Sequence, residues 1–295
     1  AGDYSRIHAR YHPMFHRYLS AFGFYDLLLI SAPEGRVLYT VMKEIDLGVS
    51  LTTAPYQSTA LARTYQRALL KKAGDTTEAV IEDYSPYVAS GFAPGAFIAA
   101  PIRRAGAIVG VLVMQISIHE VDRLMTGDRR WDEEGMGGTG EAYIVGPDNL
   151  LRSDLRLQIE DPEAFYRRLS AAGADSNLIQ RLRLTDTSIL TLPMDLKPMK
   201  PSQPWQGSGI ARSVLDTPVL RSLGTLDIPD LRWVLVAEMD VEEALAPVKR
   251  LRTQIWTIGL VIAVTFFLIA GWLGASVAQP FLDSLKPPAG SERAI

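Results

Sequence analysis

The sequence predicts an α+β fold: two tandem lobes with antiparallel sheets, carried on a long N-terminal helix and followed by one transmembrane helix. Three observations predict it. Apolar residues recur at three- and four-residue steps over residues 3–22. Short apolar runs separated by turn residues then give a strand-and-helix order that partly repeats. Residues 255–278 contain no Asp, Glu, Lys, Arg or His, which is typical of a membrane span.

The N-terminal helix is predicted over residues 3–22, and Pro13 is expected to kink it. The first lobe follows with the order β-β-α-β-β-β. Its strands are predicted at residues 25–31, 37–42, 79–83, 96–102 and 107–118. Its helix is predicted at residues 57–72. This order resembles that of PAS-like sensor folds, in which helix covers one side of a five-stranded sheet.

The second lobe is expected to repeat part of this order after a helix at residues 119–125. Its strands are predicted at residues 141–146, 150–153, 187–192, 209–215, 219–226 and 232–239. Two helices are predicted between them, at residues 162–172 and 177–182. Only the order of elements supports a repeat, because the two halves share no repeated sequence.

The transmembrane helix is predicted at residues 255–278. A helix rises about 1.5 Å per residue, so about 20 residues cross a hydrocarbon core of roughly 30 Å. Trp256 and Trp272 lie near the two ends, where interfacial aromatic residues are common. The alternative is a buried helix of a soluble enzyme, although such helices rarely run this long without a charge. A helix at residues 241–254, begun by Asp240 as N-cap, is expected to continue into the span.

Composition and charge exclude several classes of protein. The net charge of −3 and the absence of a basic patch argue against a nucleic-acid partner. The absence of cysteine excludes disulfides, thiolate catalysis and cysteine-ligated metals. Lys249, Arg250 and Arg252 precede the span, whereas Lys286 and Arg293 follow it. Taken alone, the positive-inside rule would therefore place the large domain in the cytoplasm.

Several segments together resemble the double Cache (dCache) domain of bacterial transmembrane receptors. They are FYDLLLI, GRVLYTVMKEIDLG, PYQSTALA, DYSPYVAS, GAFIAAPI, IVGVLVMQISI, GGTGEAYIVGPDNLLRSD and LRWVLVAEMD. The resemblance covers roughly residues 3–252, which is most of the chain. The resemblance implies an extracytoplasmic, ligand-binding sensor between two spans of the inner membrane, often dimeric. Members serve adenylate or guanylate cyclases, which this variant most resembles, or chemotaxis transducers, histidine kinases and diguanylate cyclases. The implied topology outweighs the charge count and places the large domain in the periplasm.

The two ends of the chain depart from the family's pattern. A first span is expected before Ala1. After the second span, GASVAQPFLDSL resembles the start of a HAMP signal-transfer helix, but KPPAG at residues 286–290 cannot continue a helix. The output domain is therefore expected to be missing, and the chain itself is not expected to be an enzyme. The segments expected are a stalk helix at 1–22, a membrane-distal lobe at 23–125, a membrane-proximal lobe at 126–240, a juxtamembrane helix at 241–254, the span at 255–278, and a HAMP-like start and tail at 279–295.

Two patterns suggest metal or phosphate binding and are interpreted otherwise. His8, His12 and His16 share one face of the first helix, where an i, i+4 pair can chelate a metal. Pro13 lies among them and no carboxylate cluster joins them, so no metal site is predicted. GGTGE at residues 137–141 lacks the Lys-Ser/Thr of a P-loop and precedes a strand. It is expected to be a tight entry into the second lobe. No cofactor and no catalytic residue are predicted, since no GxSxG, HExxH or zinc-ligand spacing occurs.

Lys43, Glu44 and Asp46 follow the second strand, and two interpretations of them remain open. Three ionisable groups in one loop can hold a zwitterionic ligand. They can equally form internal salt bridges that fix the loop. For Asp26, which opens the first strand, a role in capping backbone groups is the alternative to ligand contact.

Aromatic residues bracket the helix and the long loop of the first lobe, where a PAS-like fold would have its pocket. They are Tyr56, Tyr84, Tyr87, Phe92 and Phe97, and Gln115 in the last strand can add a polar group. The same residues can also be ordinary core. The predicted ligand-binding residues are Tyr56, Tyr84, Tyr87, Phe97, Gln115, Lys43 and Asp46. The Arg-x-Trp-Tyr motif of the amino-acid-binding subfamily is absent, because LRWV at residues 231–234 lies in the other lobe and lacks the Tyr.

The sequence therefore favours a signal receptor that binds a small molecule in the distal lobe and passes a conformational change through the transmembrane helix. The alternative is a ligand-free ectodomain that serves dimerisation or protein docking. An anchored enzyme would need a carboxylate dyad or a metal site that the sequence does not reveal.

Overall fold

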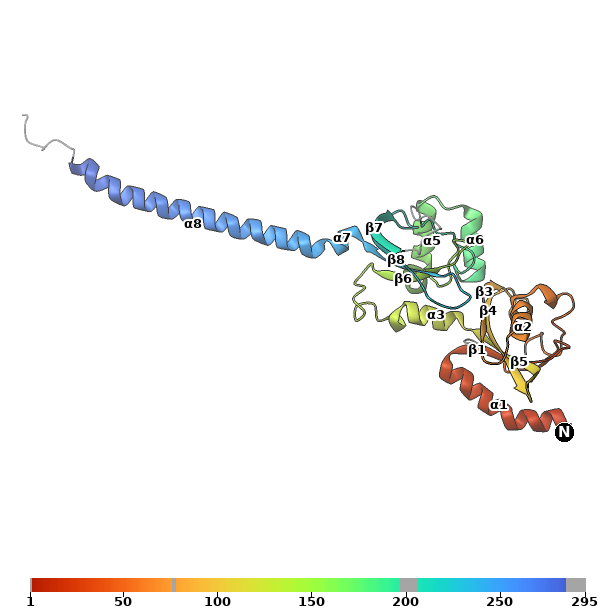
Figure 1. Cartoon of the computed structure of the whole chain (residues 1–295). Coiled ribbons are helices and arrows are strands. Elements are labelled where there is room, and N and C mark those ends of the chain that lie inside the picture. Colours follow the sequence, from red (N-terminus) through yellow and green to blue (C-terminus); the bar gives the residue numbers. More distant parts are fainter. Residues whose placement is uncertain (1, 76–77, 197–205, 285–295) are drawn as a thin grey trace, which may run out of the picture. The chain divides into compact units, whose positions relative to one another are not determined.

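The computed structural model describes residues 2–75, 78–196 and 206–284, and its fold is α+β as the sequence predicts. The chain divides into two units, one that ends at Val241 and one that begins at Glu242. The first unit contains two antiparallel sheets, and each sheet belongs to one lobe (Figure 1).

The first lobe is built on a five-stranded sheet in the order β2-β1-β5-β4-β3. The strands are β1 (Phe24–Ser31), β2 (Val37–Thr40), β3 (Val80–Pro86), β4 (Pro94–Arg104) and β5 (Ala107–Ile116). Helix α2 (Ala60–Leu69) follows a short 3₁₀ turn, η1 (Tyr56–Ser58). Thr59 begins α2 because its hydroxyl accepts a hydrogen bond from the amide of Ala62 at 3.2 Å.

The two faces of this sheet are covered by different helices. Leu28 and Ile30 of β1 pack with α2 in a cluster of buried side chains. Leu27, one residue before Leu28, points to the other face and packs there with Leu19 of α1 (Asp3–Phe22). Gly23 ends α1 in the left-handed region, at φ 71°, and its amide donates to the Leu19 carbonyl at 2.8 Å. Helix α1 thus has the bounds that the sequence predicts.

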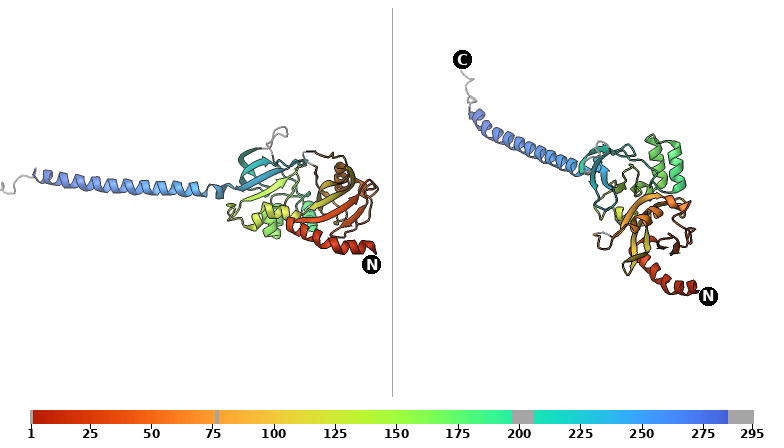
Figure 2. Two further views of the ribbon diagram at one scale, coloured as in Figure 1. Left: turned by 60° about the horizontal axis from the view of Figure 1, so that its bottom comes forward. Right: turned by 45° about the vertical axis from the view of Figure 1, so that its right-hand side comes forward.

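The second lobe is built on a four-stranded sheet in the order β6-β9-β8-β7. The strands are β6 (Glu141–Val145), β7 (Gln206–Arg212), β8 (Pro218–Thr225) and β9 (Val234–Asp240). Helix α3 (Ile118–Met125) and turn η2 (Gly127–Arg129) lead into it, and α4 (Arg156–Glu160), α5 (Pro162–Ala171) and α6 (Ser176–Thr185) follow β6. Figure 2 shows α5 and α6 side by side. Phe165 and Leu169 of α5 pack against Val236 of the sheet.

Two predicted strands of the second lobe are wrong. Residues 150–153 make only isolated bridges, from Leu151 to Val145 and from Leu150 to Pro193. Residues 187–192 form turns, since the Leu192 amide donates to the Ser188 carbonyl at 2.9 Å. Both stretches are short apolar runs, which periodicity alone cannot distinguish from buried loops. Their side chains are buried or half-buried, so the pattern is correct about burial and wrong about the backbone.

Within the first unit, the lobes meet through an ion pair and an aromatic stack. The guanidinium of Arg152 donates to both carboxylate oxygens of Asp83 on β3, at 2.8 and 2.9 Å. The indole N–H of Trp233 donates to the same carboxylate at 2.9 Å. The rings of Tyr84 and Trp233 stack with centroids 5.9 Å apart. Asp83 of the first lobe therefore has two partners in the second.

Asp122 of α3 and Asp154, which lies between β6 and α4, give the fold a pH dependence. Asp122 accepts from the Asp154 amide at 2.7 Å, and Asp154 accepts from the Ser188 amide at 2.6 Å. Burial raises the pKa of Asp122 to about 6. Burial, and then the charge of Asp122, raises the pKa of Asp154 to about 7. Both values lie above that of an unfolded Asp. Their contribution to stability is therefore present below about pH 4 and is lost as the pH rises through 6 and 7.

An Asp154→Asn variant is expected to remove most of this pH dependence. The amide oxygen can still accept from Ser188, but the side chain no longer titrates. Between pH 5 and 7.5 the wild type should lose about 2 kcal/mol more unfolding free energy than the variant, because folded Asp154 holds a proton over much of this range that the unfolded chain has already released. Denaturant unfolding at the two pH values checks this. Equal losses in both chains would contradict it.

The second unit is dominated by one long helix. After α7 (Val241–Ala244), α8 runs from Ala246 to Ser284 as one continuous helix. Its stretch Ala246–Leu282 has a mean hydropathy of 2.3 and is long and apolar enough to cross a membrane. The predicted span at residues 255–278 lies inside it. Of the predicted HAMP-like start and tail, residues 279–284 continue the helix, and residues 285–295 lie outside the described residues.

Candidate functional site

Asp26 fixes the loop that carries the candidate site. Its side chain is only 1% exposed. One carboxylate oxygen, Oδ1, accepts from the amides of Leu27, Val41 and Met42 at 2.7, 2.9 and 3.0 Å. The other, Oδ2, accepts from the Thr40 hydroxyl at 2.8 Å. Burial raises the pKa of Asp26, and these four donors oppose that shift. Asp26 therefore caps backbone groups at the end of β2 and holds the start of the loop 41–46.

Asp46, at the end of that loop, lies against two tyrosines. The Tyr87 hydroxyl donates to Asp46 Oδ2 at 2.6 Å. The other oxygen, Oδ1, is buried and has no hydrogen-bond partner among the described residues. Burial raises the pKa of Tyr56, and the charge of Asp46 adds to that shift, which places both side chains in one electrostatic cluster. The Tyr87 ring meets the Phe97 ring edge-on, with centroids 5.1 Å apart.

Glu44 joins this cluster through hydroxyl groups. It accepts from the Tyr25 hydroxyl at 2.7 Å and from the Ser90 hydroxyl at 3.0 Å. The Gln115 amide donates to Ser90 at 3.4 Å. Burial raises the pKa of Asp46; the Tyr87 hydrogen bond opposes this, and the nearby charges of Asp26 and Glu44 add to it. We call the following set the Asp46 cluster: Tyr25, Glu44, Asp46, Tyr56, Tyr87, Ser90, Phe97 and Gln115.

The structure brings five of the predicted ligand-binding residues together and places two elsewhere. The five are Asp46, Tyr56, Tyr87, Phe97 and Gln115, all at most 7% exposed. Lys43 lies on the α1 side of the sheet: its ammonium donates to the Thr40 carbonyl and lies 3.9 Å from the Tyr39 ring centroid. Tyr84 packs on Trp233 at the contact between the lobes. Among the described residues, Lys43 forms no ion pair with Glu44 or Asp46, so the salt-bridge interpretation of this loop is wrong.

The three histidines of α1 lie beside Tyr39. The rings of His8 and His12 stack with centroids 4.5 Å apart, and His12 Nδ1 lies 2.7 Å from the Tyr39 hydroxyl. Burial lowers the pKa of His12, and the neighbouring charges of His8, Lys43 and His16 lower it further. No group of three or more metal-binding side chains occurs in residues 2–75, 78–196 and 206–284.

The Asp46 cluster has the chemistry of a site for a cation. It combines two carboxylates, tyrosine hydroxyls and the faces of aromatic rings, and it includes no Lys or Arg. A protonated amine can donate to the carboxylates and also interact with aromatic faces. An anionic ligand would be repelled by the same carboxylates.

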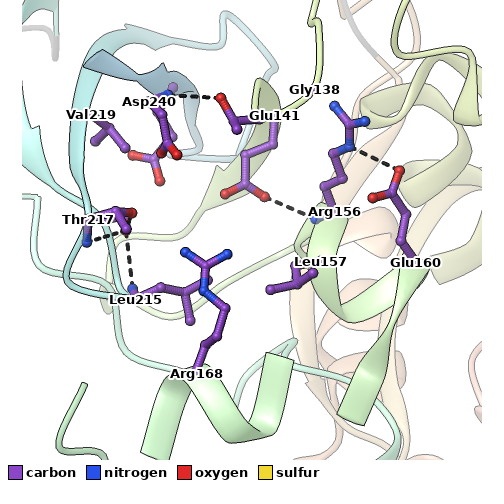
Figure 3. Close-up of a pocket in the computed structure, with 13 residues that line it drawn as sticks. Gly138, Glu141, Arg156, Leu157, Glu160, Arg168, Leu215, Thr217, Val219 and Asp240 are labelled. Carbon is purple, nitrogen blue, oxygen red and sulfur yellow. Dashed lines mark hydrogen bonds and ion pairs between the residues drawn. The ribbon is translucent and has the colours of Figure 1, made fainter. Parts of the chain in front are cut away.

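A second candidate lies in the other lobe, where a cavity of about 100 Å³ opens between the sheet and α4 and α5. Figure 3 shows Glu141, Asp240 and Arg168 pointing into it. These residues are not among those that the sequence predicts, and neither are Tyr25 and Ser90 of the Asp46 cluster. In the second lobe, one signal in the sequence could have indicated a site, namely acidic residues at the ends of apolar runs. Glu141 begins one such run, and Glu238 and Asp240 end another.

No protein-family model matches the sequence, and no curated protein matches it. Solved structures are similar in fold. The ligand-binding domain of the Pseudomonas fluorescens chemoreceptor CtaA with L-alanine is 14% identical, with a TM-score of 0.45 and 78% of each chain covered. That of the Pseudomonas aeruginosa amino acid chemoreceptor PctB with L-Arg is 18% identical, with a TM-score of 0.44 and coverage of 82% of this chain and 78% of that one.

A third similar structure is the extracellular domain of the putative histidine kinase rpHK1S-Z16. It is 11% identical, with a TM-score of 0.47, and 80% of this chain and 79% of that one are covered. The likeness is one of fold.

Proposed function

We propose that this chain is the ligand-sensing part of a bacterial transmembrane receptor. In this proposal the first lobe is membrane-distal and binds a small molecule with a protonated amine at the Asp46 cluster. The large domain lies in the periplasm, and α8 crosses the inner membrane and passes the change to a cytoplasmic output domain. The domain limits proposed are those given by the sequence, with lobes at 23–125 and 126–240. The chain itself is proposed not to be an enzyme.

The observation that carries this proposal is the unpaired oxygen of Asp46. A buried carboxylate oxygen without a donor costs free energy, so such groups need an explanation in a folded protein. The Tyr87 hydroxyl holds Oδ2, so Oδ1 is the oxygen that is left for a ligand. A ligand ammonium would satisfy Oδ1 and balance the charge of the cluster.

Ligand binding could change the shape of the first lobe through the loop 41–46. This loop is tied to the sheet by Asp26 and to the segment around Ser90 by Glu44. A ligand shifts a conformational equilibrium only by its difference in affinity for the two states. An ammonium bound to Asp46 and Glu44 would favour the state in which both carboxylates face the ligand. From there the change would pass to the second lobe, where β9 continues into α7 and α8.

Asp46→Asn is expected to weaken amine binding at least tenfold. The variant keeps an oxygen for the Tyr87 hydroxyl but loses the charge that an ammonium needs. The test is a thermal-shift screen of the whole chain in detergent against ethylamine, ethanolamine, putrescine, choline and amino acids. A ligand at 100 times its Kd adds about 2.7 kcal/mol to the folded state.

Lys43→Met is the matched control, because the structure places this ammonium on the other side of the sheet. Its affinity for the same amine should equal that of the wild type. If no amine stabilises the wild type, or if Asp46→Asn binds as well as the wild type, the proposed site is lost.

The alternative, a dimerisation or docking ectodomain, is favoured by one observation. Helix α1 exposes a row of large apolar side chains at three- and four-residue spacing: Tyr4, Ile7, Tyr11, Met14, Tyr18 and Phe22. Such a row suits pairing with the same helix of a second copy. The two functions are compatible, and a stable dimer without any ligand response would favour the alternative alone.

A further inference from the structure

A row of ionisable side chains crosses the packed face of the second sheet. In the strand register Glu141 of β6 lies opposite Glu238 of β9, and Glu238 lies opposite Arg221 of β8. The next row on the same face contains Tyr143, Val236 and Leu223, which belong to the buried core. Like charges directly opposite each other destabilise a sheet. Two carboxylates side by side at the edge of a core therefore call for an explanation.

Only part of this charge is compensated inside the protein. Arg221 Nε donates to Glu238 Oε2 at 2.7 Å, and both side chains are buried. Glu141 accepts from the backbone amide of Arg156 at 3.0 Å. Burial raises the pKa of Glu141 to about 7, and the charge of Glu238 adds to this shift. The ion pair of Arg221 satisfies Glu238. Glu141 accepts only a backbone amide, and the charge of Arg156, whose guanidinium is bonded to Glu160, opposes the rise in its pKa.

Glu141 faces a cavity that also receives a cation. The cavity has a volume of about 100 Å³, which is far more than one ordered water needs. Figure 3 shows Arg168 of α5 reaching towards Glu141 from the opposite wall, with Asp240 of β9 beside them. No hydrogen bond or ion pair joins the Arg168 guanidinium to the other side chains drawn there. The lining also includes Arg156 and Glu160, which are bonded to each other, and Glu238, which is bonded to Arg221. Glu141, Asp240 and Arg168 are thus the charged side chains that face the open space.

We propose that this cavity is a second ligand site, which binds a small zwitterion with its carboxylate on Arg168 and its protonated amine between Glu141 and Asp240. A guanidinium offers a planar pair of donors that fits a carboxylate. A simple anion would meet the repulsion of Glu141 and Asp240. A simple amine would leave Arg168 without a partner. A molecule with both charges a few bonds apart satisfies all three side chains.

The position of this site gives it a role distinct from that of the Asp46 cluster. Asp240 is the last residue of β9, and Val241 begins α7, from which the chain continues into α8. The Asp240 amide also donates to the hydroxyl of Thr139 at 3.1 Å. This bond ties the end of β9 to the segment just before β6. A ligand held by Asp240 acts on the residue that precedes the helical segment and can bias that segment without any change in the first lobe.

The test uses the whole chain in detergent with the substitution Asp46→Asn, so that the first lobe does not contribute. The probes are glycine, β-alanine, 4-aminobutanoate, L-alanine and L-glutamate, together with glycolate and methylamine, which each keep one half of glycine. Calorimetric titration is expected to show binding of at least one zwitterion. Glycolate and methylamine are expected to bind at least tenfold more weakly than that zwitterion.

Arg168→Gln is expected to lower the affinity at least tenfold, and the melting temperature without ligand should stay unchanged because this side chain is exposed. Arg167→Gln, one residue earlier on the same helix and also exposed, should bind as the parent does. Binding that survives Arg168→Gln, equal binding of glycolate, or no binding by any of the five zwitterions would overturn the proposal. None of these results bears on amine binding that depends on Asp46. The two proposed sites can therefore be confirmed or rejected independently.

Discussion

Replacing Asp83 with alanine should lower the free energy of unfolding by about 3 kcal/mol, because it leaves a buried guanidinium without its main partner. The side chain of Arg152 is 3% exposed, and both of its bonds to Asp83 are short. The same substitution removes the acceptor of the Trp233 indole N–H. Arg152 keeps Asp148 at 3.0 Å, but that carboxylate is 45% exposed and compensates less. Denaturant unfolding of the whole chain in detergent measures the loss.

The double variant Asp83→Ala with Arg152→Met is the control for this prediction. Removing both charges leaves an apolar contact, which costs much less than a single unpaired charge. The double variant should therefore be more stable than Asp83→Ala alone, although it lacks one more native side chain. A loss below about 1 kcal/mol for Asp83→Ala would place this pair with ordinary surface ion pairs and would contradict a structural role at the contact between the lobes.

Long periodic segments were predictable from the sequence, whereas short buried ones were not. Helix α1 begins and ends where its apolar periodicity does. The apolar stripe marks its packed face, and Gly23 marks its end. The five strands of the first lobe follow from alternating or wholly apolar runs between turn residues. Residues 150–153 and 187–192 have the same composition as strands but pair with nothing beyond single bridges. Pairing depends on tertiary position, which a local pattern does not contain.

The candidate site was predictable where loops end at one edge of the sheet. Tyr56, Tyr87 and Asp46 come together because the segments that carry them all border the same end of β1, β4 and β5. Lys43 and Tyr84 lie outside the Asp46 cluster because the local backbone conformation directs their side chains away from it. Lys43 has φ 61°, in the left-handed region, which turns its side chain away from its neighbours. A register shift between Glu82 and Ser85 changes the alternation of β3 and sends Tyr84 to the opposite face.

The ionisable row of the second lobe lies beyond sequence reasoning for a different reason. Glu141 and Glu238 are far apart in the chain and meet only because β6 and β9 pair with a particular register. A shift of one residue would send Glu238 to the other face of the sheet. Carboxylates are frequent in this sequence, so neither of them stands out until the strands are paired.

Replacing Asp26 with alanine should cost about 3 to 4 kcal/mol and also abolish binding at the Asp46 cluster. The substitution leaves three backbone amides and one hydroxyl without their acceptor in a site that is 1% exposed. Each buried donor left unpaired costs about 1 kcal/mol or more. The released segment carries Glu44 and Asp46, so their carboxylates would no longer be held together. Thermal unfolding and amine titration of the same preparation measure both effects.

Asp26→Asn separates the hydrogen bonds of Asp26 from its charge. All three backbone amides donate to one oxygen, Oδ1, which an asparagine retains. Its Nδ2 can donate to the Thr40 hydroxyl oxygen in place of the bond that Thr40 now donates. The loop geometry should therefore survive, with a loss below about 1.5 kcal/mol and amine affinity within a few fold of the wild type. If Asp26→Asn loses amine binding as fully as Asp26→Ala does, Asp26 is itself a partner of the ligand. In that case Asp26 contributes to binding through its charge more than through its hydrogen bonds to the loop.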